Sequence, residues 1–253
     1  MRPTRRPPET VERGAAARLL DWRERYGDAG LSVILVLQVA IMFVVGPLAG
    51  TGVISVQATA VLRVGLAATA ILMVSRSRLV GGLMAASFAV SLLCTALLRT
   101  GAASRATLFA NIGVTIAFDM AVAWTVAHAA FGPGRITVHR IMGAVILYLY
   151  IGLIFAALFH VAALTLHPSF KGLPATSDAT FGALLYFSLT TLTTSGFGDI
   201  VPVHPFVRAL ANLESVAGQL YPATLVARLV TLHVAREEKA AADSESDEGG
   251  SST

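Results

Sequence analysis

Six apolar stretches, each about 17–27 residues long, dominate this chain of 253 residues. A helix that crosses a bilayer needs about 20 consecutive apolar residues, and one water-soluble core has no use for so many segments of this length. Charged residues make up only 13% of the chain, whereas soluble proteins carry about a quarter. The sequence therefore predicts an all-α membrane protein with six transmembrane helices, at Leu31–Pro47, Ser55–Val74, Leu79–Leu98, Ala106–Ala129, Ile141–Leu164 and Phe206–Leu232.

A seventh apolar piece, Thr180–Leu192, is too short to cross a bilayer. We expect it to form a re-entrant helix between the fifth and sixth spans, with irregular backbone after it at membrane depth. Such backbone is tolerated only where it is buried in protein or lines a wet cavity. The shortness of this piece thus indicates a pore loop.

The loop that follows has two glycines around an aromatic residue, with threonines before them and an aspartate after. Glycine allows a backbone that alternates between conformations, so that successive carbonyl oxygens point one way and replace the water around a cation. One loop supplies one oxygen per level and the chain has no internal repeat, which predicts a symmetric homo-oligomer. The candidate ligands are the carbonyls of Thr194, Ser195, Gly196, Phe197 and Gly198, with the Thr194 hydroxyl at the inner mouth and with Thr193 and Asp199 as supports.

The segment Tyr186–Pro202 (YFSLTTLTTSGFGDIVP), with Glu214–Tyr221 and Ala227–Val230 after it, resembles the pore region of tetrameric potassium channels. It is most similar to the bacterial six-helix members that carry one pore loop. This resemblance implies a homotetramer whose fifth and sixth spans line the pore. The family's filter reads Thr-Val-Gly-Tyr-Gly-Asp, which Thr194, Gly196, Gly198 and Asp199 match, while Ser195 replaces valine and Phe197 replaces tyrosine. It also implies K⁺ as the permeant ion, bound at Thr194, Ser195, Gly196 and Phe197.

Four functional hypotheses follow. The first is a passive potassium channel, and the second is a weakly selective sodium/potassium channel, suggested by the hydroxyl of Ser195 behind the filter. The third is a potassium transporter subunit, although such transporters contain four loops in one chain and this chain has one. The fourth is a non-conducting membrane scaffold. The sparse Ser, His and acidic residues suggest no hydrolase, so we predict that the protein is not an enzyme and has no cofactor.

The last span contains residues that are candidates for a functional role. Glu214 lies about three turns into this span, at a depth where a charged side chain is costly and usually functional. We expect Glu214 to support the filter, the alternative being that it raises the local cation concentration. Gly218 and Pro222, four residues apart, are gate candidates because they give the helix a flexible point and a kink. Close helix packing is the alternative for both.

Arg63 and Asp119 fall at mid-membrane depth in the second and fourth spans. An isolated charge there is costly, so we predict an intramembrane ion pair. The alternative, a remnant of a voltage sensor, is less favoured because the fourth span lacks an Arg at every third position.

The basic residues set the topology. Seven Arg precede the first span, and by the positive-inside rule both termini are cytoplasmic. This layout predicts the lipid bilayer and identical subunits as partners, and no nucleic acid. The excess of Arg over Lys and the Ala-rich spans suggest a bacterial inner membrane. The predicted domains are an Arg-rich segment (1–28, an interfacial helix or a solvated cuff), a four-helix transmembrane domain (29–132), a pore domain (133–235) and a disordered cytoplasmic tail (236–253).

Overall fold

The computed structural model describes residues 31–50, 66, 78–99, 104–131, 138–174 and 177–250. Within these ranges the chain is mostly helical, with one short two-stranded antiparallel sheet. The elements are η1 (Ile41–Val45, a π-helical turn), α2 (Gly46–Gly50), α4 (Arg78–Arg99), α5 (Arg105–Phe131), α6 (Val138–Thr165), β1 (Phe170–Lys171), α7 (Ser177–Leu192), β2 (Val201–Pro202) and α8 (Pro205–Gly250).

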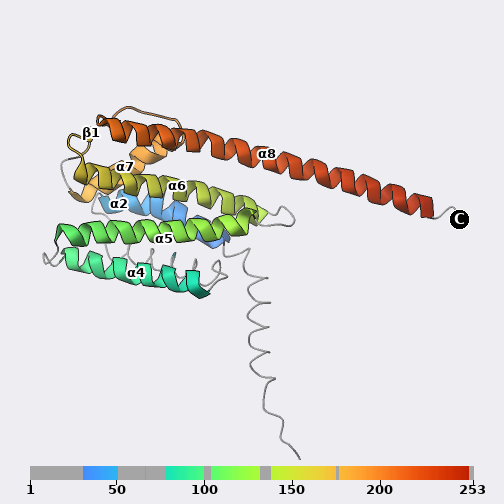
Figure 1. The fold of residues 1–253 in the computed structure, drawn as a ribbon, viewed down its shortest axis with the longest axis horizontal. Helices are drawn as coiled ribbons and strands as arrows, with labels where there is room; N and C mark the ends of the chain where they lie inside the picture. The colour runs from blue at the N-terminus through green and yellow to red at the C-terminus, as the bar shows by residue number, and fades with distance from the viewer. Residues whose placement is uncertain are drawn as a thin grey trace, which may run out of the picture.

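The helices lie side by side in chain order for much of the fold (Figure 1). Helix α4 packs on α5, α5 packs on α6, and α6 contacts both α7 and α8. The short helix α7 lies against α6 and α8, while the far half of α8 extends past the other helices (Figure 1). The last segments of the chain, α6 to α8, therefore form a unit around α7, and α6 joins this unit to α5.

Three stretches of the described residues are long and apolar enough to cross a membrane: Leu31–Leu48, Arg105–His128 and Arg140–Thr165. They coincide with the first, fourth and fifth predicted spans. Helix α4 covers the third predicted span but has a shorter apolar part, and the second span lies, apart from Leu66, outside the described residues. The sixth predicted span lies within α8. The structure agrees with an all-α membrane protein, and the count of six spans stays a prediction.

Large apolar side chains point outward from several helices. Val36 is 67% exposed, Trp124 65% and Phe206 78%. Apolar surface of this extent on one chain needs lipid or another protein against it. The outer face thus agrees with a membrane-embedded protein.

Helix α7 is held in place by its own hydrophobic cluster, which is separate from the cluster that joins Leu31, Ile34 and Leu66 to α4, α5 and α6. The rings of Phe159, Phe170 and Phe187 meet edge to face, with centroids 5.0–5.8 Å apart. Leu184, Ile200 and Val207 complete the cluster. One ring comes from α6, one from β1 and one from α7, so this cluster fixes the start of α8 and the sheet around the middle of α7.

The predicted tail differs from the structure. Composition predicts disorder for residues 236–253, whereas α8 continues as helix to Gly250. Ala, Glu and Lys at the start of this region are strong helix formers, and they extend a helix that is already nucleated. The Arg-rich segment 1–28 lies outside the described residues.

Candidate functional site

Helix α7 ends at Leu192 by giving its last carbonyls to the loop that follows. Thr194 N donates to Thr191 O (3.0 Å) and Ser195 N donates to Thr190 O (2.8 Å). Together with the left-handed Thr194 (φ 55°) these bonds form a Schellman motif. The loop thus begins with its backbone N–H groups turned back toward the helix.

The backbone of the loop alternates in conformation. Thr194, Gly196 and Gly198 have φ of 55°, 51° and 77°, whereas Ser195 and Phe197 between them do not enter the left-handed region. All side chains from Thr193 to Asp199 are exposed in the single chain. Within the described residues no hydrogen bond reaches the carbonyl oxygens of residues 194–198. These oxygens are therefore available to something outside the chain.

Tyr186 of α7 holds the outer part of this loop. Its ring stacks on Phe197, with centroids 6.1 Å apart and planes at 9°, and its hydroxyl interacts with the Asp199 carboxylate. Phe197 is nevertheless 72% exposed. A hollow of about 230 Å³ lies between the loop, α7 and Ala211 of α8. One chain therefore supports the aromatic ring on one side only.

The β1–β2 pair braces the chain just after the loop. Phe170 pairs with Pro202 and Lys171 with Val201 in antiparallel register. Gly172, at φ +90°, passes so close to Asp199 that an added Cβ would overlap the Asp199 carbonyl oxygen. Only glycine suits this crossing, because both the conformation and the space exclude a side chain.

The inner end of the loop is tied to α8. Gln219 Nε2 donates to Thr194 Oγ1 (2.8 Å), and Thr194 Oγ1 donates to Thr193 O (2.7 Å). The Thr194 hydroxyl, expected at the inner mouth, is thus already engaged within the chain.

Helices α6 and α8 meet the end of α7 at Leu192. Tyr148 of α6 donates to Leu192 O (3.1 Å). Gly218 of α8 lies against the same residue, and a Cβ added there would overlap Leu192 O and sit 2.8 Å from its carbonyl carbon. This is the close packing considered for Gly218, while the gate role of Gly218 and Pro222 stays a prediction. Helix α8 passes through Pro222 without ending.

Glu214 is completely buried against α7. Its Oε1 lies 2.5 Å from Ser188 Oγ, which lies 2.7 Å from Gly152 O of α6. Glu214 Oε2 has no hydrogen-bond partner among the described residues. The predicted support of the filter by Glu214 has a physical route through Ser188 and stays a prediction.

One member of the predicted intramembrane ion pair lies outside the residues that the structure describes. Arg63 is not among the described residues. Asp119 is buried in α5, close to Tyr150 of α6. The pair stays a prediction.

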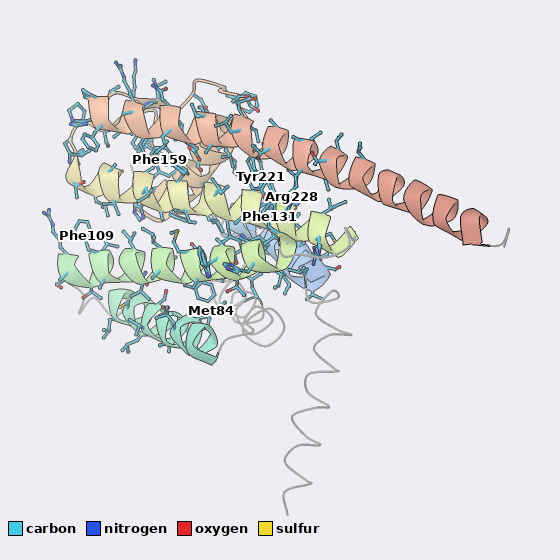
Figure 2. All side chains as sticks on the ribbon, turned by 45° about the vertical axis from the view of Figure 1, so that its right-hand side comes forward. Met84, Phe109, Phe131, Phe159, Tyr221 and Arg228 are labelled. Atoms are coloured by element: carbon cyan, nitrogen blue, oxygen red, sulfur yellow. The ribbon has the colours of Figure 1, made fainter. Side chains whose placement is uncertain are left out.

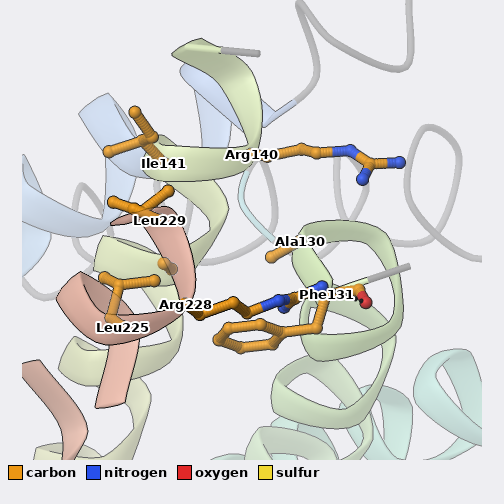
Figure 3. A pocket seen from close by; sticks show the side chains of 8 residues that line it. Ala130, Phe131, Arg140, Ile141, Leu225, Arg228 and Leu229 are labelled. Carbon is orange, nitrogen blue, oxygen red and sulfur yellow. Dashed lines mark hydrogen bonds between the residues drawn. The ribbon is translucent and has the colours of Figure 1, made fainter. Parts of the chain in front are cut away.

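At the other end of the bundle α8 is fastened to α5 and α6. Arg228 donates to Phe131 O (2.7 Å), and its guanidinium lies 4.8 Å from the centre of the Phe131 ring. Tyr221 donates to Ala144 O (2.7 Å). Figure 2 shows Tyr221, Arg228 and Phe131 close together, and Figure 3 shows Arg228 lying along the Phe131 ring beside a small cavity. The end of α5 is thus mechanically linked to α8.

Sequence reasoning missed several residues of this site: Tyr148, Gly152, Tyr186, Ser188 and Arg228. A serine inside an otherwise apolar short helix is a signal for Ser188, since buried hydroxyls are hydrogen-bonded. Nothing in the spacing alone pairs Tyr148 with Leu192 or Arg228 with Phe131, because these contacts depend on how distant helices pack.

Residues 143–234 match a family model described as an ion channel. The matched range begins in α6, includes α7 and the loop, and ends in α8, so it coincides with the unit formed around α7. No curated protein matches the chain. The match supports the ion channel superfamily and a channel function for ions, and the apolar helices agree with a membrane protein.

Proposed function

We propose that this chain is one subunit of a passive cation channel, selective for potassium, in which four copies place their loops around a common axis. The observation that carries the proposal is the alternating backbone of residues 194–198, whose carbonyl oxygens receive no hydrogen bond within the described chain. Once four loops enclose them, such unpaired carbonyl oxygens are costly unless something replaces their lost hydration. A dehydrated cation needs such oxygens as its ligands.

The same geometry supports assembly from several copies. One loop offers one oxygen per level, and the ion needs several. The exposed ring of Phe197 and the hollow beside it give a neighbouring copy a surface to pack on. Closed symmetry is the usual way to repeat one site around an axis.

In this proposal K⁺ is the permeant ion and binds at the levels of Thr194, Ser195, Gly196 and Phe197. Thr193, Asp199 and Glu214 support the filter, and Gly218 and Pro222 are the gate positions. The protein lies in the bacterial inner membrane with both termini in the cytoplasm, and it carries out no enzymatic reaction.

One observation favours a second candidate, a weakly selective sodium/potassium channel. Ser195 Oγ lies 3.0 Å from Thr193 Oγ1, so a second hydroxyl, at the position where the resembled family has an apolar valine, joins that of Thr193 beside the loop. Their hydrogen bonds compete for the groups that hold the carbonyls in place. Ion-replacement currents separate the two candidates, because equal reversal potentials in sodium and potassium exclude potassium selectivity.

The deciding experiment measures potassium flux into liposomes that contain either the wild-type protein or Gly196→Ala. Gly196 has φ +51°, where a side chain costs about 1–2 kcal/mol, so alanine should distort the loop and lower flux severely. Gly113→Ala in α5 is the control, because no atom of the described residues lies within 4 Å of an added Cβ there. Equal flux in all three proteins would show that ions do not pass along this loop. Native mass spectrometry should find four copies, and a monomer would refute the assembly.

A further inference from the structure

Three helices meet at one line of oxygen atoms, away from the loop carbonyls. Ser188 of α7 and Glu214 of α8 are both completely buried. Ser188 Oγ lies 2.7 Å from Gly152 O of α6 and 2.5 Å from Glu214 Oε1. Both distances are those of full hydrogen bonds between oxygen atoms.

Two such bonds need two protons. The Ser188 hydroxyl supplies one and the Gly152 carbonyl supplies none, so the second can come only from Glu214. We infer that Glu214 is a neutral carboxylic acid that donates to Ser188 Oγ while Ser188 donates to Gly152 O. This chain of bonds joins α8 to α7 and α7 to α6.

The surroundings of Glu214 agree with a neutral acid. Among the described residues no cationic side chain forms a salt bridge with Glu214, and its Oε2 has no hydrogen-bond partner. An ionised carboxylate in such a place would be buried without compensation, which is costly at membrane depth. The ionisable group that faces it from α6 is Tyr148, whose hydroxyl is already bonded to Leu192 O.

Gly152 makes the line of oxygens possible. A Cβ at this position would lie 3.1 Å from Leu189 Cδ2 and 3.6 Å from Ser188 Oγ, so its absence lets α7 approach the α6 backbone. Ser188 is about one turn before the end of α7, where the loop begins. Glu214 is therefore a positioning residue for the loop. This positioning role rests on the proposed channel function, whereas the protonation of Glu214 is independent of that function.

Infrared difference spectra of purified wild type and Glu214→Gln test the protonation. Wild type should show the C=O stretch of a protonated carboxyl, shifted by deuteration and absent in Glu214→Gln. Asp199→Asn is the control, because Asp199 is exposed and should lose carboxylate bands instead. Loss of carboxylate bands in Glu214→Gln would overturn the inference.

Potassium flux tests the positioning role. Glu214→Gln keeps a donor for Ser188, so its flux should stay within about twofold of wild type, whereas Glu214→Ala and Ser188→Ala should each lower flux by about fivefold or more, the factor for one lost hydrogen bond. The double alanine variant should lose no more than either single one. The positioning role would be refuted if Ser188→Ala had the same flux as wild type, or if Glu214→Gln lowered flux as much as Glu214→Ala. If wild type itself carries no flux, the channel proposal fails while the infrared result still decides the protonation.

Discussion

Replacing Gly218 by alanine should force α8 away from α7. The added Cβ would overlap Leu192 O and lie 2.8 Å from the Leu192 carbonyl carbon. An ordinary contact begins at 3.4 Å, so the helix must move by at least 3.4 − 2.8 = 0.6 Å, and by more to clear the oxygen. The obstacle is backbone, which cannot turn aside as a side chain does. The neighbouring bond from Gln219 to Thr194, 2.8 Å long, would be stretched by the same movement.

Three terms give the size of the effect. Overpacking costs about 1–3 kcal/mol, and the stretched hydrogen bond costs about 1 kcal/mol. Exchanging a helical glycine for alanine returns about 1 kcal/mol. The net loss for Gly218→Ala is therefore about 1–3 kcal/mol.

Thermal unfolding of the purified protein measures this loss. Gly113→Ala is the matched control, since it makes the same exchange within helix α5 at a position where the described part of the chain places no atom within 4 Å of the added Cβ. We expect Gly113→Ala to unfold at or slightly above the wild-type temperature and Gly218→Ala several degrees below it. Equal unfolding temperatures for the two variants would refute the close packing of α8 on Leu192.

Two further predictions concern single contacts. Tyr186→Phe keeps the ring on Phe197 but loses the interaction with Asp199, so it should lower the unfolding temperature only slightly. Tyr186→Ala should lower the unfolding temperature more and should also lower potassium flux. Equal effects of the two substitutions would show that the hydroxyl rather than the ring matters. Arg228→Ala should lower the free energy of unfolding by roughly 1–3 kcal/mol. Arg228→Lys keeps the charge over Phe131 but not the guanidinium geometry, so we expect it to retain part of this stabilisation. An unaltered unfolding temperature in Arg228→Ala would show that the contact contributes nothing.

The elements that depend on local pattern could be predicted from the sequence. The first, fourth and fifth apolar stretches coincide with helical segments, and the short stretch Thr180–Leu192 lies within α7, because helix length and hydropathy are properties of contiguous residues. The positive φ values at Gly196 and Gly198 agree with an alternating loop, since glycine adopts them without strain.

The features that depend on packing between distant helices could not be predicted from the sequence. Thr194 has φ 55° although threonine resists that conformation, and the reason is the helix end it closes together with its bond to Gln219. The partner of Glu214 is Ser188, 26 positions earlier, and no periodicity relates the two. Helix α8 continues to Gly250 across a segment for which composition predicts disorder, because a segment attached to an existing helix needs no nucleation of its own.

The way α7 ends has a consequence for which ions the loop can tolerate. The N–H groups of Thr194, Ser195 and Gly196 donate to carbonyls of the preceding helix, and among the described residues no donor reaches the loop's own carbonyl oxygens. A single subunit therefore presents a surface of negative partial charge, which repels chloride and other anions before any second copy is added. In the proposed channel, one chain's backbone would therefore separate positive from negative ions, while a choice among positive ions would require the ring that several copies form.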